Sequence, residues 1–245
     1  MEQETLINAA ENFRIVRENV AEAAVKSGRS PEDVRLVAVT KFVEEERILP
    51  ALEAGCLEVG ENRAQELRDK FGFFKAHGQT VHFIGKLQLN KVKYLIGRAD
   101  LIQSADRLEA FVEIDRLAGQ HGLIQPCLAE INIGEEPQKG GVAPCELFEL
   151  LKVISGMPNV LVKGLMCIPP AAGSEDAVYY FKKQRELFES AKELELPNVS
   201  MEILSMGMSG DYISAIAEGA NMVRVGSAIF GPRHYNQPST LRGDI

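Results

Sequence analysis

The stretch RLVAVT at residues 35–40 is an uninterrupted, mostly apolar run that ends directly at Lys41. Short runs of this kind, rich in β-branched residues, predict strands that are buried on both faces, as in a parallel sheet. Seven further runs follow, and longer amphipathic stretches separate them. They occupy residues 57–60, 81–84, 100–103, 126–131, 160–166, 200–204 and 222–225.

The stretches between these runs carry helix signals. Asp106 and Glu109 have the spacing of a capping box. Ser174 can begin a long helix that Pro197 would end. A further helix is expected over residues 5–26, before the first strand. Strands that alternate with helices are parallel, because each crossover helix returns the chain to the same edge of the sheet.

Eight such units fit either a closed barrel or a doubly wound sheet. No Gly-rich dinucleotide turn follows the first strand, which favours the barrel. We therefore expect one α/β domain over residues 1–235, a (β/α)8 TIM barrel with an extra N-terminal helix. Residues 236–245 are expected to form a weakly ordered tail.

Composition excludes several function classes. The formal net charge is −8, and no dense Lys/Arg run is present, so binding to nucleic acid or to an anionic membrane is not expected. The mildly basic residues 86–98 have apolar residues between them, which indicates a solvated helix face. The N-terminus has no signal-peptide pattern and the chain has no long uncharged apolar run, so the expected location is the cytoplasm.

The cysteines and histidines show no ligand spacing. The four histidines lack metal-ligand or nucleophile patterns, so no metal is expected. The four cysteines are far apart in apolar contexts, which predicts reduced core thiols. They are Cys56, Cys127, Cys145 and Cys167.

Lys41 is the first candidate functional residue. Barrels of this class bind ligands at the carboxyl ends of their strands, and Lys41 follows the first strand. Partial desolvation there favours a neutral, nucleophilic amine. Taken alone, a lysine at the end of a strand is usually a solvated or salt-bridged residue, so the functional interpretation depends on its companions.

The turns after the seventh and eighth strands are rich in small polar residues. Barrels frequently bind phosphate at these two turns. Gly207 and Gly226 allow close approach to backbone amides, and the hydroxyls of Ser205, Ser209 and Ser227 can contact an oxyanion. Ser209 can also cap the helix that follows it. Ordinary turn glycines and an ordinary cap remain the alternative.

Arg224 lies within the otherwise apolar eighth strand. A buried guanidinium needs a partner, which can be a structural carboxylate or a ring nitrogen of a cofactor. A nucleophilic lysine, a phosphate-binding turn and an arginine for a pyridine nitrogen together describe a site for pyridoxal 5′-phosphate (PLP).

Several motifs resemble the YggS/PROSC family of PLP homeostasis proteins, over about residues 8–235. LSMGMS and the segment around Arg224 are the most specific in combination. The motifs are LVAVTK (36–41), GEN (60–62), HFIGKLQLN (82–90), KGLMCIP (163–169), LSMGMS (204–209) and MVRVGSAIFG (222–231).

The resemblance implies a barrel like the N-terminal domain of alanine racemase, a PLP fold type III barrel without the C-terminal β-domain. It also implies that Lys41 carries PLP as a Schiff base, that Asn62 lies against the cofactor, and that Arg224 faces the pyridine nitrogen. The serines and Gly226 would bind the phosphate. The cofactor-binding residues implied in this way are Lys41, Asn62, Ser205, Ser209, Arg224, Gly226 and Ser227.

The chain departs from the family pattern at three positions. Lys86 and Leu89 stand where His and Ser are expected, and Arg63 stands where an aromatic residue is common. These departures bear on contacts at the entrance of the site and leave Lys41 unaffected.

An arginine at the ring nitrogen disfavours ring protonation and weakens PLP as an electron sink. Two-base racemisation also needs a second acid or base, which alanine racemase supplies from a separate β-domain; the chain ends about ten residues after its last barrel segment. We therefore expect a protein of vitamin B6 homeostasis that binds, stores or delivers PLP without robust catalysis. PLP-dependent apo-enzymes are candidate recipients of the cofactor. The protein is also expected to be a monomer. A small PLP-dependent racemase or lyase that uses Lys41, and a PLP-sensing regulatory module, remain alternatives.

Overall fold

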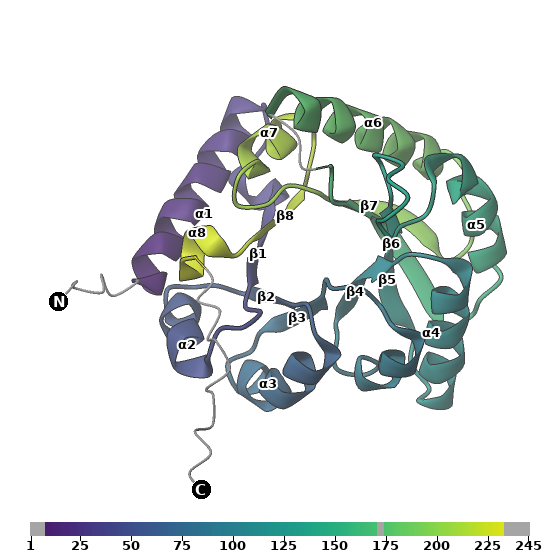
Figure 1. Cartoon of the computed structure of the whole chain (residues 1–245), viewed down its shortest axis with the longest axis horizontal. Coiled ribbons are helices and arrows are strands. Elements are labelled where there is room, and N and C mark those ends of the chain that lie inside the picture. The colour runs from purple at the N-terminus through teal and green to yellow at the C-terminus, as the bar shows by residue number, and fades with distance from the viewer. Residues whose placement is uncertain (1–7, 171–173, 233–245) are drawn as a thin grey trace, which may run out of the picture.

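Eight parallel strands close into a barrel in the computed structural model, which describes residues 8–170 and 174–232 (Figure 1). The order of the strands around the barrel follows the sequence, and β8 pairs with β1. The strands are β1 (Arg35–Val39), β2 (Glu58–Glu61), β3 (Thr80–Phe83), β4 (Leu101–Ala105), β5 (Gln125–Ile131), β6 (Val160–Cys167), β7 (Val199–Ser205) and β8 (Met222–Val225). The predicted (β/α)8 barrel is confirmed.

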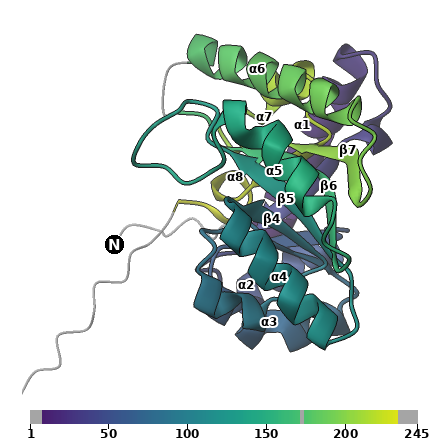
Figure 2. The same cartoon turned by 90° about the vertical axis from the view of Figure 1, so that its right-hand side faces the viewer.

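Helices surround the strands. Figure 2 shows α4, α5 and α6 on the outside of the barrel wall. The α-helices are α1 (Ala9–Lys26), α2 (Glu45–Glu53), α3 (Ala64–Ala76), α4 (Leu108–Gln120), α5 (Leu147–Ile154), α6 (Ser174–Lys192), α7 (Tyr212–Ala217) and α8 (Ser227–Phe230). Short 3-10 helices are η1 (Pro31–Asp33), η2 (Leu89–Tyr94) and η3 (Pro144–Glu146).

Both ends of the described chain meet on one side of the barrel. Helix α1 lies beside α8 in Figure 1, and Asn12 Nδ2 donates to the carbonyl of Ile229 at 3.0 Å. Residues 5–7 of the predicted N-terminal helix and the predicted weakly ordered tail lie outside the described residues. The extra helix is confirmed from Ala9 onward.

Two local predictions are wrong in detail. No side-chain capping bond forms at α4, whose N-cap is Arg107, because Asp106 Oδ1 instead accepts from Arg107 Nη1 at 2.5 Å. The stretch 86–98 forms the short η2 rather than a full α-helix, although Val92 and Leu95 within it are buried as the spacing predicts.

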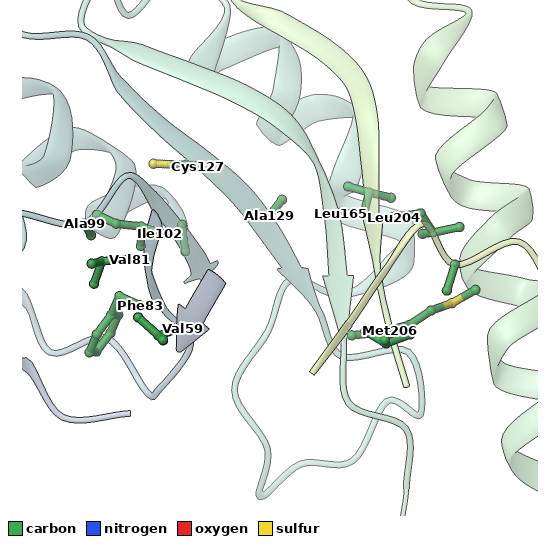
Figure 3. Close-up of a cluster of buried hydrophobic side chains, with 14 of the residues drawn as sticks. Val59, Val81, Phe83, Ala99, Ile102, Cys127, Ala129, Leu165, Leu204 and Met206 are labelled. Carbon is green, nitrogen blue, oxygen red and sulfur yellow. The ribbon is translucent and has the colours of Figure 1, made fainter. Parts of the chain in front are cut away.

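Side chains alternate between the two faces of the barrel wall, because successive residues of a strand point in opposite directions. Figure 3 shows outward residues, among them Val59, Val81 and Leu204, in the apolar layer under the helices. A second cluster fills the barrel interior. Its members are Val37, Leu101, Leu128, Met166, Ile203 and Met222.

This alternation predicts which polar residues share the interior. Gln103, Ser205 and Arg224 each lie two positions after an interior residue. Lys41 follows Val37 by four positions, so the same parity directs it toward the mouth of the barrel. Insertion of one residue into a strand would turn the side chains that follow it to the opposite face of the barrel wall.

Gly164 allows the sixth and seventh strands to approach. Its φ is +148°, and a Cβ atom there would lie 1.9 Å from the carbonyl oxygen of Ile203. The pairing of β6 with β7 shifts register at this point. Only glycine tolerates both the conformation and the close backbone approach.

Within the described ranges, no helix is long and apolar enough to cross a membrane. The same residues contain no group of three or more His, Cys, Asp or Glu that could hold a metal ion. Cys56, Cys127 and Cys167 are free and buried, as predicted, but Cys145 is exposed in η3, so its assignment to the core is wrong.

Candidate functional site

A cavity of about 850 Å³ opens at the carboxyl ends of the strands. Its volume lies within the range of small-molecule sites, about 300–1,000 Å³. Lys41 and Arg224 both line it, together with residues of the turns after β7 and β8. Of the seven predicted site residues, the cavity collects Lys41, Asn62, Ser209, Arg224, Gly226 and Ser227, while Ser205 is not among its lining residues.

The lining of the cavity is basic although the protein is acidic. Lys41, Arg47, Arg63 and Arg224 contribute positive charge, and Glu44 contributes one negative charge. The formal net charge of the whole chain is −8. A concave basic patch on an acidic molecule concentrates anions, so the lining suits a negatively charged ligand.

A buried ion pair anchors the turn that carries Lys41. Thr40, the residue before it, donates its hydroxyl to Glu61 Oε1 at 2.7 Å. Lys70 Nζ donates to the same oxygen and to the carbonyl of Thr40, both at 3.0 Å. The side chain of Glu61 is fully buried, and that of Lys70 is 12% exposed. Burial raises the pKa of Glu61, and the charge of Lys70 opposes that rise.

The other side of the turn is fixed through Phe42. Its φ is +59°, an uncommon value for a residue with a side chain. Its amide donates to Glu66 Oε2 at 2.8 Å, and the guanidinium of Arg63 lies 4.4 Å from its ring centroid. Lys41 is therefore held between two anchored neighbours.

Sequence analysis missed this anchoring network of Thr40, Glu61, Lys70 and Glu66. The sequence held one signal of this network. Side chains alternate along the strand, so Thr40, next to the inward Lys41, is expected to point outward toward the helices. The outward partners come from β2 and from helix α3, and only the folded structure pairs them.

Arg224 is buried at the edge of the cavity, with 4% exposure. Nη1 donates to Ser205 Oγ at 2.5 Å, and Nη2 donates to the carbonyl of Cys167 at 2.9 Å. Burial lowers the pKa of the guanidinium. Among the described residues, a hydroxyl and a carbonyl accept two of its five side-chain N–H groups, so donors remain for a ligand.

Ser205 lies behind Arg224. Its side chain is fully buried, and its hydroxyl donates to Gln103 Oε1 at 2.7 Å while accepting from Arg224. This position suits a residue that orients the guanidinium. A direct contact of Ser205 with phosphate stays a prediction.

Ser209 joins the turns after β7 and β8. Its Oγ accepts from the amides of Gly226 at 3.2 Å and of Ala228 at 3.4 Å. The prediction that Ser209 caps the following helix is wrong. The turn continues to Asp211, which is the N-cap residue of α7, and that helix begins at Tyr212. Amides and hydroxyls thus gather at one edge of the cavity, an arrangement that suits an oxyanion.

Asn62, which lines the same cavity as Lys41, has an unsatisfied polar atom. Its Oδ1 is buried and accepts no hydrogen bond from the residues the structure describes. Such an atom is costly unless a ligand or ion supplies the missing donor. Gly85 fits tightly against it, since a Cβ there would lie 2.0 Å from the carbonyl oxygen of Asn62.

Of the three departures from the family pattern, Arg63 borders the cavity. Lys86 and Leu89 are not among the lining residues, and both are exposed. The guanidinium of Arg63 lies 4.4 Å from the ring centroid of Phe42 at the border of the cavity, so of the three positions only this one can alter its entrance.

Glu130 was also missed by sequence analysis. Burial and the nearby carboxylate of Asp106 raise its pKa to about 7, while Arg224 and Lys86 act in the opposite direction. Its position two residues after Leu128 gives it inward parity. It is not among the lining residues of the cavity.

Comparison with known proteins identifies the family. The model of the alanine racemase N-terminal domain matches residues 12–234. A pyridoxal phosphate homeostasis protein of Aquifex aeolicus is 42% identical over 230 residues, which cover 94% of this chain and 100% of the relative. The chain belongs to the pyridoxal phosphate homeostasis protein family. The Escherichia coli K12 member is 37% identical over 234 residues, which cover 93% of this chain and 98% of that protein.

Solved structures agree with this family assignment. PipY of Synechococcus elongatus, solved with PLP bound, has a TM-score of 0.80 and 31% identity, and the match covers 91% of this chain and 100% of PipY. Alanine racemase of Corynebacterium glutamicum has a TM-score of 0.64 at 15% identity, over 89% of this chain and 60% of the racemase. The second likeness shows the fold alone. The predicted resemblance to PLP homeostasis proteins is confirmed.

Proposed function

We propose that this chain binds PLP reversibly at the barrel mouth and serves PLP homeostasis as a holder or donor of the cofactor. The amine of Lys41 condenses with the aldehyde of PLP to form a Schiff base and releases one water molecule. Arg224 donates to the pyridine nitrogen. PLP, when bound, supplies an electrophilic carbonyl carbon; the protein supplies orientation and charge.

One observation carries this proposal. A single basic cavity brings Lys41 and Arg224 together with the amides and hydroxyls of the turns after β7 and β8. A ligand that fits must combine an electrophile, a ring acceptor and an anionic group. PLP has all three.

The remaining contacts follow from the local geometry. The orphaned Oδ1 of Asn62 is available to accept from a hydroxyl of the ligand. Ser209, Gly226 and Ser227 bind the phosphate through hydroxyl and amide groups, and the basic lining adds long-range attraction. The family relationship to PipY, solved with PLP bound, supports the same ligand.

The proposed hydrogen bond from Arg224 to the pyridine nitrogen favours binding of PLP over catalysis by it. An arginine beside the pyridine nitrogen keeps that nitrogen unprotonated, and the ring then withdraws electrons weakly. Glu130, whose pKa burial raises to about 7, is not among the cavity-lining residues. We therefore propose no robust reaction, and a small racemase or lyase activity that depends on Lys41 remains the competing hypothesis.

Absorbance spectroscopy tests PLP binding. The purified protein mixed with PLP is expected to show a Schiff-base band at about 420 nm, and Lys41→Ala is expected to lose it. Lys86→Ala serves as the control, since Lys86 is an exposed lysine outside the cavity lining and should keep the band. A band that survives in Lys41→Ala would refute the assignment.

Transfer experiments test the role as a donor. The loaded protein is mixed with a PLP-dependent apo-enzyme, and recovery of enzyme activity is compared with that given by free PLP at equal concentration. Faster or protected transfer supports delivery. Turnover of amino acids by the protein itself, abolished in Lys41→Ala, would instead favour the enzyme.

A further inference from the structure

A chain of buried polar side chains crosses the barrel interior and ends at Arg224. Arg224 Nη1 donates to Ser205 Oγ at 2.5 Å, and the Ser205 hydroxyl donates to Gln103 Oε1 at 2.7 Å. Gln103 Nε2 lies 2.9 Å from His82 Nδ1. These four residues come from β8, β7, β4 and β3, and none is more than 4% exposed. Closure of the barrel is what brings the four strands to a common interior.

Met222 fixes the direction of these hydrogen bonds. Gln103 Nε2 also donates to Met222 Sδ, at 3.2 Å. A thioether sulfur carries no hydrogen, so the amide must turn its NH2 group toward Met222 and its oxygen toward Ser205. The same NH2 group faces His82 Nδ1, which must then be an acceptor. His82 is therefore the tautomer that carries its hydrogen on Nε2.

The far end of the chain suits this tautomer. His82 Nε2 lies 3.1 Å from Glu58 Oε2 without forming a hydrogen bond to it, and Arg35 Nε donates to the other oxygen of Glu58 at 2.7 Å. Burial opposes ionisation of Glu58, but the combined effects of His82 and Arg35 outweigh it and lower the pKa of the carboxyl. At this distance the negative charge of an ionised Glu58 favours the tautomer that carries its hydrogen on Nε2.

The direction of these side-chain hydrogen bonds decides which atoms of Ser205 face Arg224. A serine hydroxyl has one hydrogen, and Gln103 Oε1 takes it. The lone pairs of Ser205 are then the groups that face the guanidinium, which can only donate. Were the amide reversed, the serine hydrogen would be free to turn toward Arg224, and two donors would meet.

We propose that His82 and Gln103 are positioning residues, which act through Ser205 to hold Arg224 in the orientation that meets the ring nitrogen of the ligand. This inference rests on the proposed PLP site, and neither residue is among those that line the cavity. In a purely packing role, the two side chains would matter for stability and not for the direction of hydrogen bonds.

The first test needs no PLP. In the apo-protein labelled with 15N-histidine, the ring shifts of His82, assigned by their loss in His82→Asn, are expected to show a hydrogen on Nε2 and an unprotonated Nδ1. The opposite tautomer would overturn the proposal. Because this readout is independent of ligand, it separates failure of the chain from failure of PLP binding.

The second test compares His82→Asn with His82→Leu. The two side chains have nearly the same shape, and both lose the contact with Glu58. Only asparagine can place an acceptor near the position of Nδ1 for Gln103. His82→Asn is expected to keep the absorbance maximum of bound PLP. Its dissociation constant for PLP should be about tenfold lower than that of His82→Leu, to within about threefold, since one directed hydrogen bond changes affinity about tenfold.

Equal dissociation constants and spectra for these two variants would overturn the proposal. If His82→Leu fails to fold, Gln103→Leu provides the same comparison, because it removes the acceptor of the Ser205 hydroxyl directly. It is expected to weaken PLP about tenfold and to shift the absorbance maximum. Wild-type affinity and spectrum in Gln103→Leu would refute the role of the chain.

Discussion

Replacing Lys70 by methionine removes the buried cation that anchors the turn of Lys41. Lys70 Nζ donates to the carbonyl of Thr40 and to Glu61 Oε1, both at 3.0 Å. Methionine fills a similar volume with no charge and no donor. The carboxylate of Glu61 then remains buried and loses its counter-charge.

The structure sets the size of the effect. Glu61 is fully buried and Lys70 is 12% exposed, so solvent screens the pair little. Removing one partner of a buried pair costs about 3–5 kcal/mol, and we expect about 3 kcal/mol because a buried carboxyl can take up a proton. For a chain of this size the loss lowers the Tm by about 6–12 °C. The looser turn should also raise the dissociation constant for PLP.

The pH dependence of the loss has a definite sign. Burial already raises the pKa of Glu61 in the folded protein, and loss of Lys70 raises it further. A carboxyl whose pKa is higher in the folded than in the unfolded state stabilises the fold at low pH, and this contribution is lost as the pH rises through the folded-state pKa. The penalty of Lys70→Met should therefore be larger at about pH 8 than at about pH 5.5.

Urea denaturation at these two pH values measures the penalty. Glu61→Gln combined with Lys70→Met should recover at least half of the stability, because the buried charge is gone. Lys75→Met is the matched control, since Lys75 lies on the same helix and pairs with Asp100 at the surface, where both side chains are more than 40% exposed. A loss below about 1 kcal/mol in Lys70→Met, or a loss equal at both pH values, would refute the reasoning.

Three further predictions address other parts of the molecule. Glu130→Gln should unfold at a higher temperature than wild type above pH 7 and show little gain near pH 5, because the pKa of Glu130 is raised to about 7 and its stabilising effect is lost as the pH rises to that value. Gly164→Ala should lose several kcal/mol in urea denaturation, since its Cβ would lie 1.9 Å from the carbonyl oxygen of Ile203, whereas Gly72→Ala, with open space around the new methyl group, should gain up to about 1 kcal/mol. Ellman's reagent should titrate one fast thiol in the native protein, and Cys145→Ser should abolish that phase, because the other three cysteines are buried.

The barrel could be predicted from sequence because its strands are buried on both faces. Such strands appear as short apolar runs, and the run at residues 222–225 matches β8 (Met222–Val225) at both ends. Helix starts were less predictable. Asp106 has the spacing of a capping residue for α4, but its carboxylate pairs with its neighbour Arg107, a competition that spacing does not reveal.

The site divides in a similar way. Lys41 and Arg224 could be found because each is a charged residue within or directly after an apolar strand, which is rare without a reason. The residues that position Arg224 and the turn of Lys41 could not be predicted from the sequence. Ser205 meets Gln103 and Glu61 meets Lys70 only through barrel closure and the packing of α3, and neither contact leaves a pattern in the local sequence.

Both supporting networks follow from one property of the barrel wall, the alternation of side chains between its faces. The outward parity of Thr40 carries the Lys41 turn into a network anchored on helix α3, while the inward parity of Arg224 carries it into the chain that leads to His82. The two groups that would hold PLP at opposite ends of its ring are thus fixed by independent sets of contacts. Fixed groups lose little conformational entropy on binding, so affinity comes from preorganisation. Loss of either network should therefore weaken PLP binding without loss of the other, and the effects of Lys70→Met and Gln103→Leu on the dissociation constant should be additive in free energy.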